Sequence, residues 1–148
     1  MKLDQLKRRE FITLLGGAAA WPLAARAEKN DGVRRVSVIM GFAENDKVWQ
    51  AYLANFRQGL QEFGWTDGRN ICFDYRFTGD SEELMRSMAE EVAGLQPDVI
   101  LVSTNSVVSA TLKATRSIPI VFTWVSDPVG SGFVTNLPHP GGNITGFP

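Results

Sequence analysis

The sequence is poor in the residues that build disulfides and metal sites. Its 148 residues include one Cys and one His. A disulfide within the chain needs two Cys, and a structural zinc site takes four Cys or His ligands, so neither can form from this chain alone. We therefore predict that Cys72 is a small buried hydrophobe, and that the protein holds no metal and no other cofactor.

The sequence also lacks an excess of charge of either sign. It has 15 Lys and Arg against 16 Asp and Glu, which gives a formal net charge of −1. This balance excludes a nucleic-acid binder that relies on a broad basic surface. Hydrophobic residues make up 44% of the chain, which excludes a solvated disordered tail. The length suits a single globular domain.

Sequence motifs of common enzymes are missing. The residues at 40–45 (MGFAEN), after the first expected strand, contain no Gly-x-Gly-x-x-Gly for a dinucleotide, and there is no Walker lysine. The single histidine, His139, follows the Gly-Ser-Gly at 130–132 by a few residues with no acidic residue between them. A Ser–His–acid triad is therefore not expected. We predict no catalytic residues and no enzyme activity.

The first 27 residues have the pattern of an export signal peptide. Basic residues precede an uncharged stretch over 11–25 that is too short to span a bilayer. This stretch runs into Ala25-Arg26-Ala27, the small-x-small pattern that signal peptidase recognises. Cleavage after Ala27 is predicted, so that residues 28–148 form the exported domain.

The beginning of this segment resembles a twin-arginine export signal. Arg8 and Arg9 are followed by Glu10 and Phe11, and the Gly- and Ala-rich stretch beyond them is only mildly apolar. Export by the Sec route and a buried core helix are the alternatives. In either export route the domain is predicted to be periplasmic, with no lasting membrane anchor.

Apolar patterns alternate between the strand and helix periods along the exported domain. Strands are expected at 33–40, 70–77, 98–103, 118–123 and 143–147, and three helices separate the first four of them. Alternation of strand and helix is typical of a parallel sheet with right-handed crossovers. We predict an α/β fold with a doubly wound parallel sheet of four to five strands and helices on both faces.

Helix boundaries are predicted from capping residues. Asn45 or Asp46 is expected to cap the first helix, and Asp80 with Glu83 is expected to form a capping box at the second. The third helix is expected from about residue 106 to 116. Trp49 lies on the apolar stripe of the first helix, which favours a place in the core. The apolar stripe of the second helix is predicted to comprise Leu84, Met88, Val92 and Leu95.

Ligands of a doubly wound sheet bind outside the carboxyl ends of its strands. This rule selects three loops, at 41–47, 103–106 and 123–132. In the second loop, Ser103, Thr104, Asn105 and Ser106 place hydroxyl and backbone N–H groups at a helix N-terminus, which is suited to a substrate carboxylate. The alternative is that Thr104 or Asn105 merely caps the third helix.

The other two loops contribute further candidate ligand-binding residues. Asp127 can accept hydrogen bonds from an amine or hydroxyl of a ligand, or it can form an Asx turn before Pro128. Trp124, Trp49 and Phe42 have aromatic rings that can stack on an apolar ligand, although the core is favoured for Trp49. The residues alone leave both interpretations of Asp127 open.

Four segments together resemble a known family. They are residues 8–22, 118–122 (IPIVF), 126–132 (SDPVGSG) and 140–146 (PGGNITG). In this order they are similar to bacterial ABC-transporter substrate-binding proteins of the tryptophan/tyrosine type. The resemblance covers essentially the whole chain, but only about the first half of a family member.

The resemblance implies a type I periplasmic-binding fold, in which two α/β lobes close on a small ligand. It implies a binding protein that delivers an amino acid or a similar carboxylate-bearing metabolite to an ABC permease in the inner membrane. The three loops would form one wall of the cleft, with 103–106 facing a carboxylate and Asp127 a polar or amino group. The alternative is a small exported flavodoxin-like enzyme or cofactor-binding domain.

The resemblance also implies that a later segment of the chain normally covers the first lobe. Without that segment apolar surface would be exposed. Residues 28–148 alone are therefore expected to be marginally stable or to self-associate, and a sharp cooperative melt of a monomer would count against this.

Overall fold

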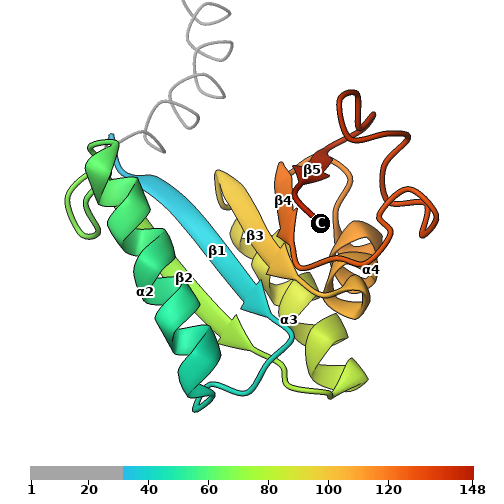
Figure 1. Ribbon diagram of the computed structural model, residues 1–148, viewed down its shortest axis with the longest axis horizontal. Helices are drawn as coiled ribbons and strands as arrows, with labels where there is room; N and C mark the ends of the chain where they lie inside the picture. The colour runs from blue at the N-terminus through green and yellow to red at the C-terminus, as the bar shows by residue number, and fades with distance from the viewer. Residues whose placement is uncertain (1–31) are drawn as a thin grey trace, which may run out of the picture. The chain divides into compact units, whose positions relative to one another are not determined.

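The computed structural model describes residues 32–148, and the predicted signal residues Arg8, Arg9, Phe11, Ala25 and Ala27 lie outside them. Strands and helices alternate as expected (Figure 1). The elements are β1 (Arg34–Met40), α2 (Lys47–Glu62), β2 (Ile71–Phe77), α3 (Glu82–Leu95), β3 (Val99–Ser103), α4 (Asn105–Ala114), β4 (Ile120–Thr123) and β5 (Ile144–Gly146).

The five strands form one sheet in the order β2-β1-β3-β4-β5, and every neighbouring pair is parallel. This confirms the predicted doubly wound sheet, including the short fifth strand. The strand order reverses direction at β1, because β2 lies on one side of it and β3 on the other. β2 is an edge strand, as its alternating pattern predicts.

Helix α2 covers one face of the sheet. Its buried residue Leu53 packs with apolar side chains of β1, β2 and β3, among them Val38 and Leu101. Figure 1 shows α2 in front of β1 and β2.

Helices α3 and α4 cover the other face (Figure 1). Buried residues of both helices pack against the centre of the sheet, where Ile39, Ile100 and Phe122 are fully buried. The first four residues of β3 are apolar because this layer and the first both contact the strand.

The helix caps agree only in part with the prediction. Asp46 caps α2, and its carboxylate accepts hydrogen bonds from the N–H groups of Val48 and Trp49. The predicted capping box of Asp80 and Glu83 is wrong. The cap of α3 is Ser81, whose Oγ accepts from the Leu84 N–H at 3.3 Å.

Two burial predictions are also wrong. The buried stripe of α3 is Met85, Ala89 and Val92, so Leu84 and Leu95 lie on the exposed side. Cys72 is exposed, because it lies on the polar side of the edge strand, in the alternating pattern that also contains Asp74.

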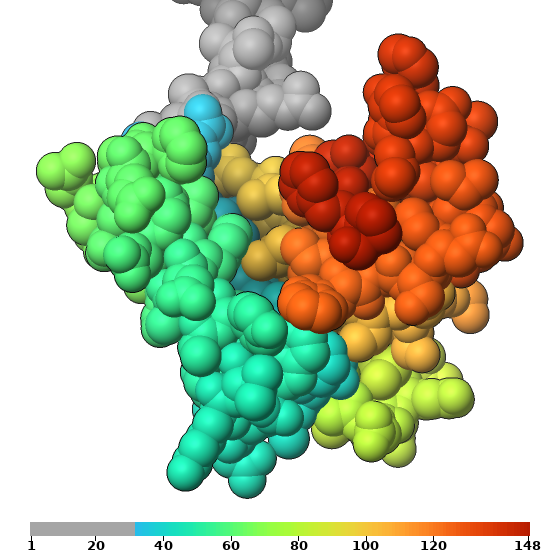
Figure 2. All heavy atoms as spheres, viewed as in Figure 1, coloured from blue at the N-terminus to red at the C-terminus, as the bar shows by residue number. Residues whose placement is uncertain are grey.

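An apolar groove runs over the sheet beside α2. Figure 2 shows the hollow between α2 and the C-terminal residues. A volume of about 460 Å³ is lined mainly by side chains of α2 and of β1, β3 and β4, including Phe56, Leu60, Leu101 and Val121. The expected exposed apolar surface is therefore present. The predicted self-association of residues 28–148 stays a prediction.

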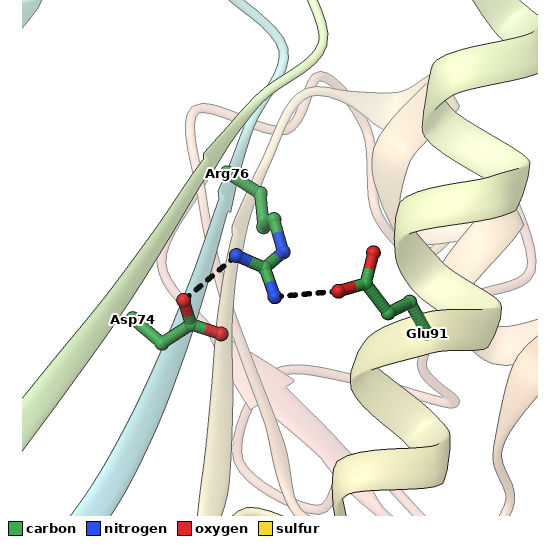
Figure 3. A network of polar contacts seen from close by, with 3 residues as sticks. All are labelled: Asp74, Arg76 and Glu91. Carbon is green, nitrogen blue, oxygen red and sulfur yellow. Dashed lines mark hydrogen bonds and ion pairs between the residues drawn. The ribbon is translucent and has the colours of Figure 1, made fainter.

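A polar network joins the edge strand to α3. Arg76 donates hydrogen bonds to Asp74 at 2.8 Å and to Glu91 at 2.9 Å. Figure 3 shows the two strand residues pointing toward the helix. The network ties the polar side of β2 to the helix layer.

Candidate ligand-binding site

Three loops meet at the carboxyl edge of the sheet. β3 lies between β1 and β4, so the residues that directly follow these strands, Gly41, Thr104 and Trp124, are neighbours along this edge. A ligand at this edge contacts loops from three different crossovers. The topology therefore assembles the candidate site from residues more than 80 positions apart in sequence.

Four aromatic rings pack together at this edge, and we call Phe42, Trp49, Tyr52 and Trp124 the aromatic cluster. Phe42 stacks on Trp49 with the ring centroids 3.5 Å apart and the planes 8° apart. Trp124 contacts the rings of Trp49 and Tyr52 at 5.1 and 5.3 Å. The cluster links the β1 loop and α2 to the β4 loop.

The aromatic cluster is open to solvent on one side. Trp124 is 55% exposed and Tyr52 45% exposed. The predicted place of Trp49 in the core is wrong, since Trp49 is only half-buried and its ring contacts are the members of this cluster. Exposed, mutually supported rings form a surface on which a planar ligand can stack.

Helix α4 starts differently from the other two helices. Thr104 is its N-cap, but the Thr104 side chain makes no capping hydrogen bond. Among the described residues, no hydrogen bond uses the backbone N–H of Ser106 or Val107 as donor. Ser106 is exposed, so its N–H is available to an external acceptor, whereas Val107 is completely buried. The helix dipole favours an anion at this end of α4.

The reason that Thr104 does not cap α4 lies in its backbone. Its φ is 69° and its ψ 150°, a region that is almost restricted to glycine. Trp124 and Asp127 also have positive φ, of 55° and 42°. Three of the four non-glycine residues with positive φ in residues 32–148 thus belong to the two candidate loops. Such conformations cost on the order of 1–3 kcal/mol each and concentrate at functional sites.

Ser103 and Thr104 pack against the β1 loop. Ser103 is completely buried, and its Oγ accepts a hydrogen bond from the Gly41 N–H at 3.1 Å. The Thr104 hydroxyl is buried without a partner in the described part of the chain. Ser103 thus joins the ends of β1 and β3, and Thr104 presents its backbone rather than its hydroxyl to the edge.

Asn105 connects two of the loops. Its amide nitrogen donates to the Ser126 carbonyl at 2.9 Å and to Ser131 Oγ at 3.1 Å, and its amide oxygen accepts from the Ser126 N–H at 2.9 Å. Asn105 therefore holds the β4 loop against the start of α4 and does not cap the helix. Ser106, the next residue, is exposed.

Asp127 forms a local turn. Its Oδ1 accepts a hydrogen bond from the Gly130 N–H at 2.8 Å, and its carbonyl accepts from the Ser131 N–H at 2.9 Å. The turn interpretation of Asp127 is therefore present in the structure. The residue is exposed and lies beside Ser126, to which Asn105 is bonded.

Sequence reasoning missed Tyr52 as a site residue, and for Trp49 it favoured the core over the site. Trp49 and Tyr52 are three positions apart on α2 and share the spacing of its core residue Leu53. Periodicity identifies a face of the helix, but it does not identify which turn extends past the end of the sheet. The only available signal was their position in the first two turns, close to the β1 loop.

Metal or acid–base chemistry has no visible basis in the described residues. No group of three or more His, Cys, Asp or Glu side chains gathers there to hold a metal ion. Burial raises the pKa of the Tyr75 hydroxyl above its usual value, but Tyr75 faces α2 from the middle of β2. The arrangement therefore supports binding of a ligand by stacking and hydrogen bonds.

The fold and the site together define a class of protein, an α/β ligand-binding lobe. A family model described as ABC transporter substrate binding protein matches residues 36–148. The chain belongs to this family, which consists of binding proteins and not of enzymes. This confirms the expected family and the absence of enzyme activity, and it leaves the flavodoxin-like enzyme without support.

Relatives with known names agree with this membership. The chain is 30% identical over 122 residues to a tyrosine-binding protein of Clostridioides difficile. The aligned residues cover 82% of this chain and 33% of that protein. It superposes on a conserved domain protein of Vibrio cholerae with a TM-score of 0.71 and 32% identity, covering 77% of this chain and 38% of the other.

Two further solved structures have the same fold. One is the ligand-free, open form of a Clostridium difficile substrate-binding protein with adhesive properties, with a TM-score of 0.70, 30% identity and the same two coverages of 77% and 38%. The other is a Streptococcus pneumonia ABC domain in complex with L-Trp, with a TM-score of 0.70, 20% identity and again coverages of 77% and 38%.

The chain spans about a third of the tyrosine-binding protein and about two fifths of the solved relatives. Within residues 32–148, none of the helices is both long and apolar enough to cross a membrane.

Proposed function

We propose that this protein binds an aromatic amino acid in the periplasm and delivers it to an ABC permease. The observation that carries the proposal is the aromatic cluster beside the uncapped N-terminus of α4. An aromatic amino acid has the two matching parts, a planar ring and a carboxylate. Two relatives support this ligand class, since one is named for tyrosine and another was solved with L-Trp.

The ring of the ligand is proposed to stack on the aromatic cluster. Trp124 and Tyr52 present exposed ring surface that the other rings hold in place. Stacking contributes about 0.5–1.5 kcal/mol per ring pair beyond the burial of apolar area. Phe42, which is stacked on Trp49, acts from behind and keeps that ring fixed.

The carboxylate of the ligand is proposed to bind at the start of α4. The N–H and the hydroxyl of the exposed Ser106 are the donors there, and the helix dipole adds to their attraction. Asp127, with one oxygen engaged by Gly130, is proposed to face the ligand amine with the other. Asn105 positions these groups through its bonds to the β4 loop.

The proposal also covers export and the place of this chain in the whole binding protein. Residues 1–27 are proposed to direct export by the twin-arginine route and to be removed after Ala27. Residues 28–148 would then form one lobe of the binding protein, and the loops at its carboxyl edge one wall of the ligand cleft.

The proposal is tested by titrating residues 28–148 with tyrosine, tryptophan, phenylalanine, leucine and tyramine in a calorimeter. The three aromatic amino acids are expected to bind more tightly than leucine, which lacks the ring, and than tyramine, which lacks the carboxylate. Trp124→Ala is expected to weaken the binding of the best ligand about tenfold, as loss of about 1.4 kcal/mol implies.

Phe63→Ala is the matched control, since Phe63 is an aromatic residue 83% exposed at the far end of α2. It is expected to leave the affinity unchanged. Equal binding of leucine and tyrosine, or equal effects of the two variants, would contradict the proposed ligand class.

A further inference from the structure

The loop that follows β1 packs very closely against the start of α4. Gly41 has no side chain, and a methyl group in its place would lie 2.5 Å from Thr104 Oγ1, 2.9 Å from Thr104 Cγ2 and 3.2 Å from Thr104 Cβ. The first two distances are shorter than any ordinary contact. Thr104 therefore occupies space that exists only because residue 41 is glycine.

Rotation of the Thr104 side chain cannot relieve such a clash. The Cβ of threonine has three staggered positions, two of which hold heavy atoms. Both positions that face Gly41 are filled, by Oγ1 and Cγ2. Any other rotamer still leaves at least one heavy atom in these two positions, so relief requires movement of the backbone at residue 104 or at residue 41.

The backbone conformation of Thr104 decides whether its side chain can cap α4. Its φ of 69° turns the side chain toward Gly41, where the hydroxyl is buried without a partner in the described residues. In the other two helices the cap residue has negative φ, and its side chain accepts hydrogen bonds from the first turn. The same threonine with negative φ could cap α4 as Ser81 caps α3.

We propose that Gly41 is a positioning residue for the ligand site, because the space left by its missing side chain lets Thr104 keep the positive φ at which it does not cap α4. The hydrogen bond from the Gly41 N–H to Ser103 Oγ fixes the glycine at this place. The first-turn N–H groups then stay free of a side-chain acceptor. The consequence for ligand affinity rests on the proposed function, whereas the conformation of Thr104 does not.

The ligand-independent test is amide hydrogen exchange of Ser106, which is exposed, in the chain and in Gly41→Ala. The added methyl group is expected to move Thr104 toward negative φ, which lets it cap the helix and slows exchange of this amide. An unchanged exchange rate at Ser106 overturns the proposal, whatever ligand data show. Gly94→Ala is the control, since Gly94 lies in α3 with open space around its Cβ position.

The ligand test is the effect of Gly41→Ala on tyrosine affinity in three backgrounds at position 104. With Thr104 the expected loss is about tenfold. With Thr104→Val, which also fills two of the three positions on Cβ, a similar loss is expected. With Thr104→Ser the single hydroxyl can rotate away from residue 41, so the Gly41→Ala effect should fall to less than about threefold.

The three backgrounds separate a specific contact from general damage. A Gly41→Ala effect of equal size in all three overturns the proposal, since loss of folding would not depend on the shape of residue 104. If the unaltered chain binds no aromatic amino acid, the proposed function fails, while hydrogen exchange still decides the role of Gly41.

Discussion

Phe122 and Trp124 are two residues apart at the end of β4, yet they lie in opposite environments. Phe122 is completely buried between the sheet and its helix layer, whereas Trp124 is 55% exposed and contacts other rings of the aromatic cluster. Phe122 belongs to a regular strand, and Trp124 has a positive φ of 55°. One aromatic residue stabilises the fold, and the other is exposed at a cost in conformational energy.

The difference shows how this domain separates its stabilising core from its candidate binding site. The sheet and its two apolar layers hold the strands in register. The loops at the carboxyl edge then carry the left-handed residues, the uncapped helix start and the exposed rings, none of which contributes much to folding. Such features persist only where the surrounding structure is rigid enough to hold them.

The largest effect expected from this comparison is that of Phe122→Ala. Truncation of a fully buried aromatic residue costs about 3–5 kcal/mol of unfolding free energy, because it removes apolar contacts and leaves a cavity. Trp124→Ala should cost less than about 1 kcal/mol, as an exposed position does. Urea denaturation of both variants measures the difference. Similar midpoints for the two would contradict the division between core and edge.

A smaller effect distinguishes the capped helix start from the uncapped one. Asp46→Ala removes the acceptor for the N–H groups of Val48 and Trp49, and should cost about 1 kcal/mol of stability. Thr104→Ala removes no capping hydrogen bond and should cost less than about 0.5 kcal/mol. The comparison uses the same denaturation midpoints, with Ser81→Ala as a second capped helix. A greater loss from Thr104→Ala than from Asp46→Ala would show that Thr104 caps α4.

The smallest effect is expected at the polar network of the edge strand. Glu91 is 60% exposed, so Glu91→Gln should lower stability by about 0.2–1 kcal/mol. Salt screens exposed ion pairs, and the difference from the unaltered chain should shrink as salt is raised. Thermal melts at low and high salt measure this. A loss that is large and independent of salt would place this network with the core rather than with the surface.

Much of the fold could be predicted from the residues. The strands were expected within about two residues of their observed ends, because runs rich in β-branched residues, such as 99–102, favour the strand conformation. The α3 cap and stripe were not, since Asp80 and Ser81 are equally good caps and only packing chooses between them. The observed stripe begins at Met85 rather than Leu84, so Leu84 lies at the surface and not in the expected core.

The candidate site was predictable by location but not in its detail. The rule for parallel sheets selected the three loops correctly as neighbours, since the observed order places β3 between β1 and β4. It did not show that Ser103 is buried, that the Asn105 amide is occupied by Ser126 and Ser131, or that Trp49 joins the aromatic cluster.

The sequence by itself determined the alternation of strands and helices, and hence the parallel sheet and the edge at which the candidate site lies. It did so because apolar period and turn residues are local properties. Only the tertiary structure decided which side chains remain free at that edge. Hydrogen bonds such as that from Gly41 to Ser103, and contacts such as that between Gly41 and Thr104, join residues more than 60 positions apart, so no local pattern contains them.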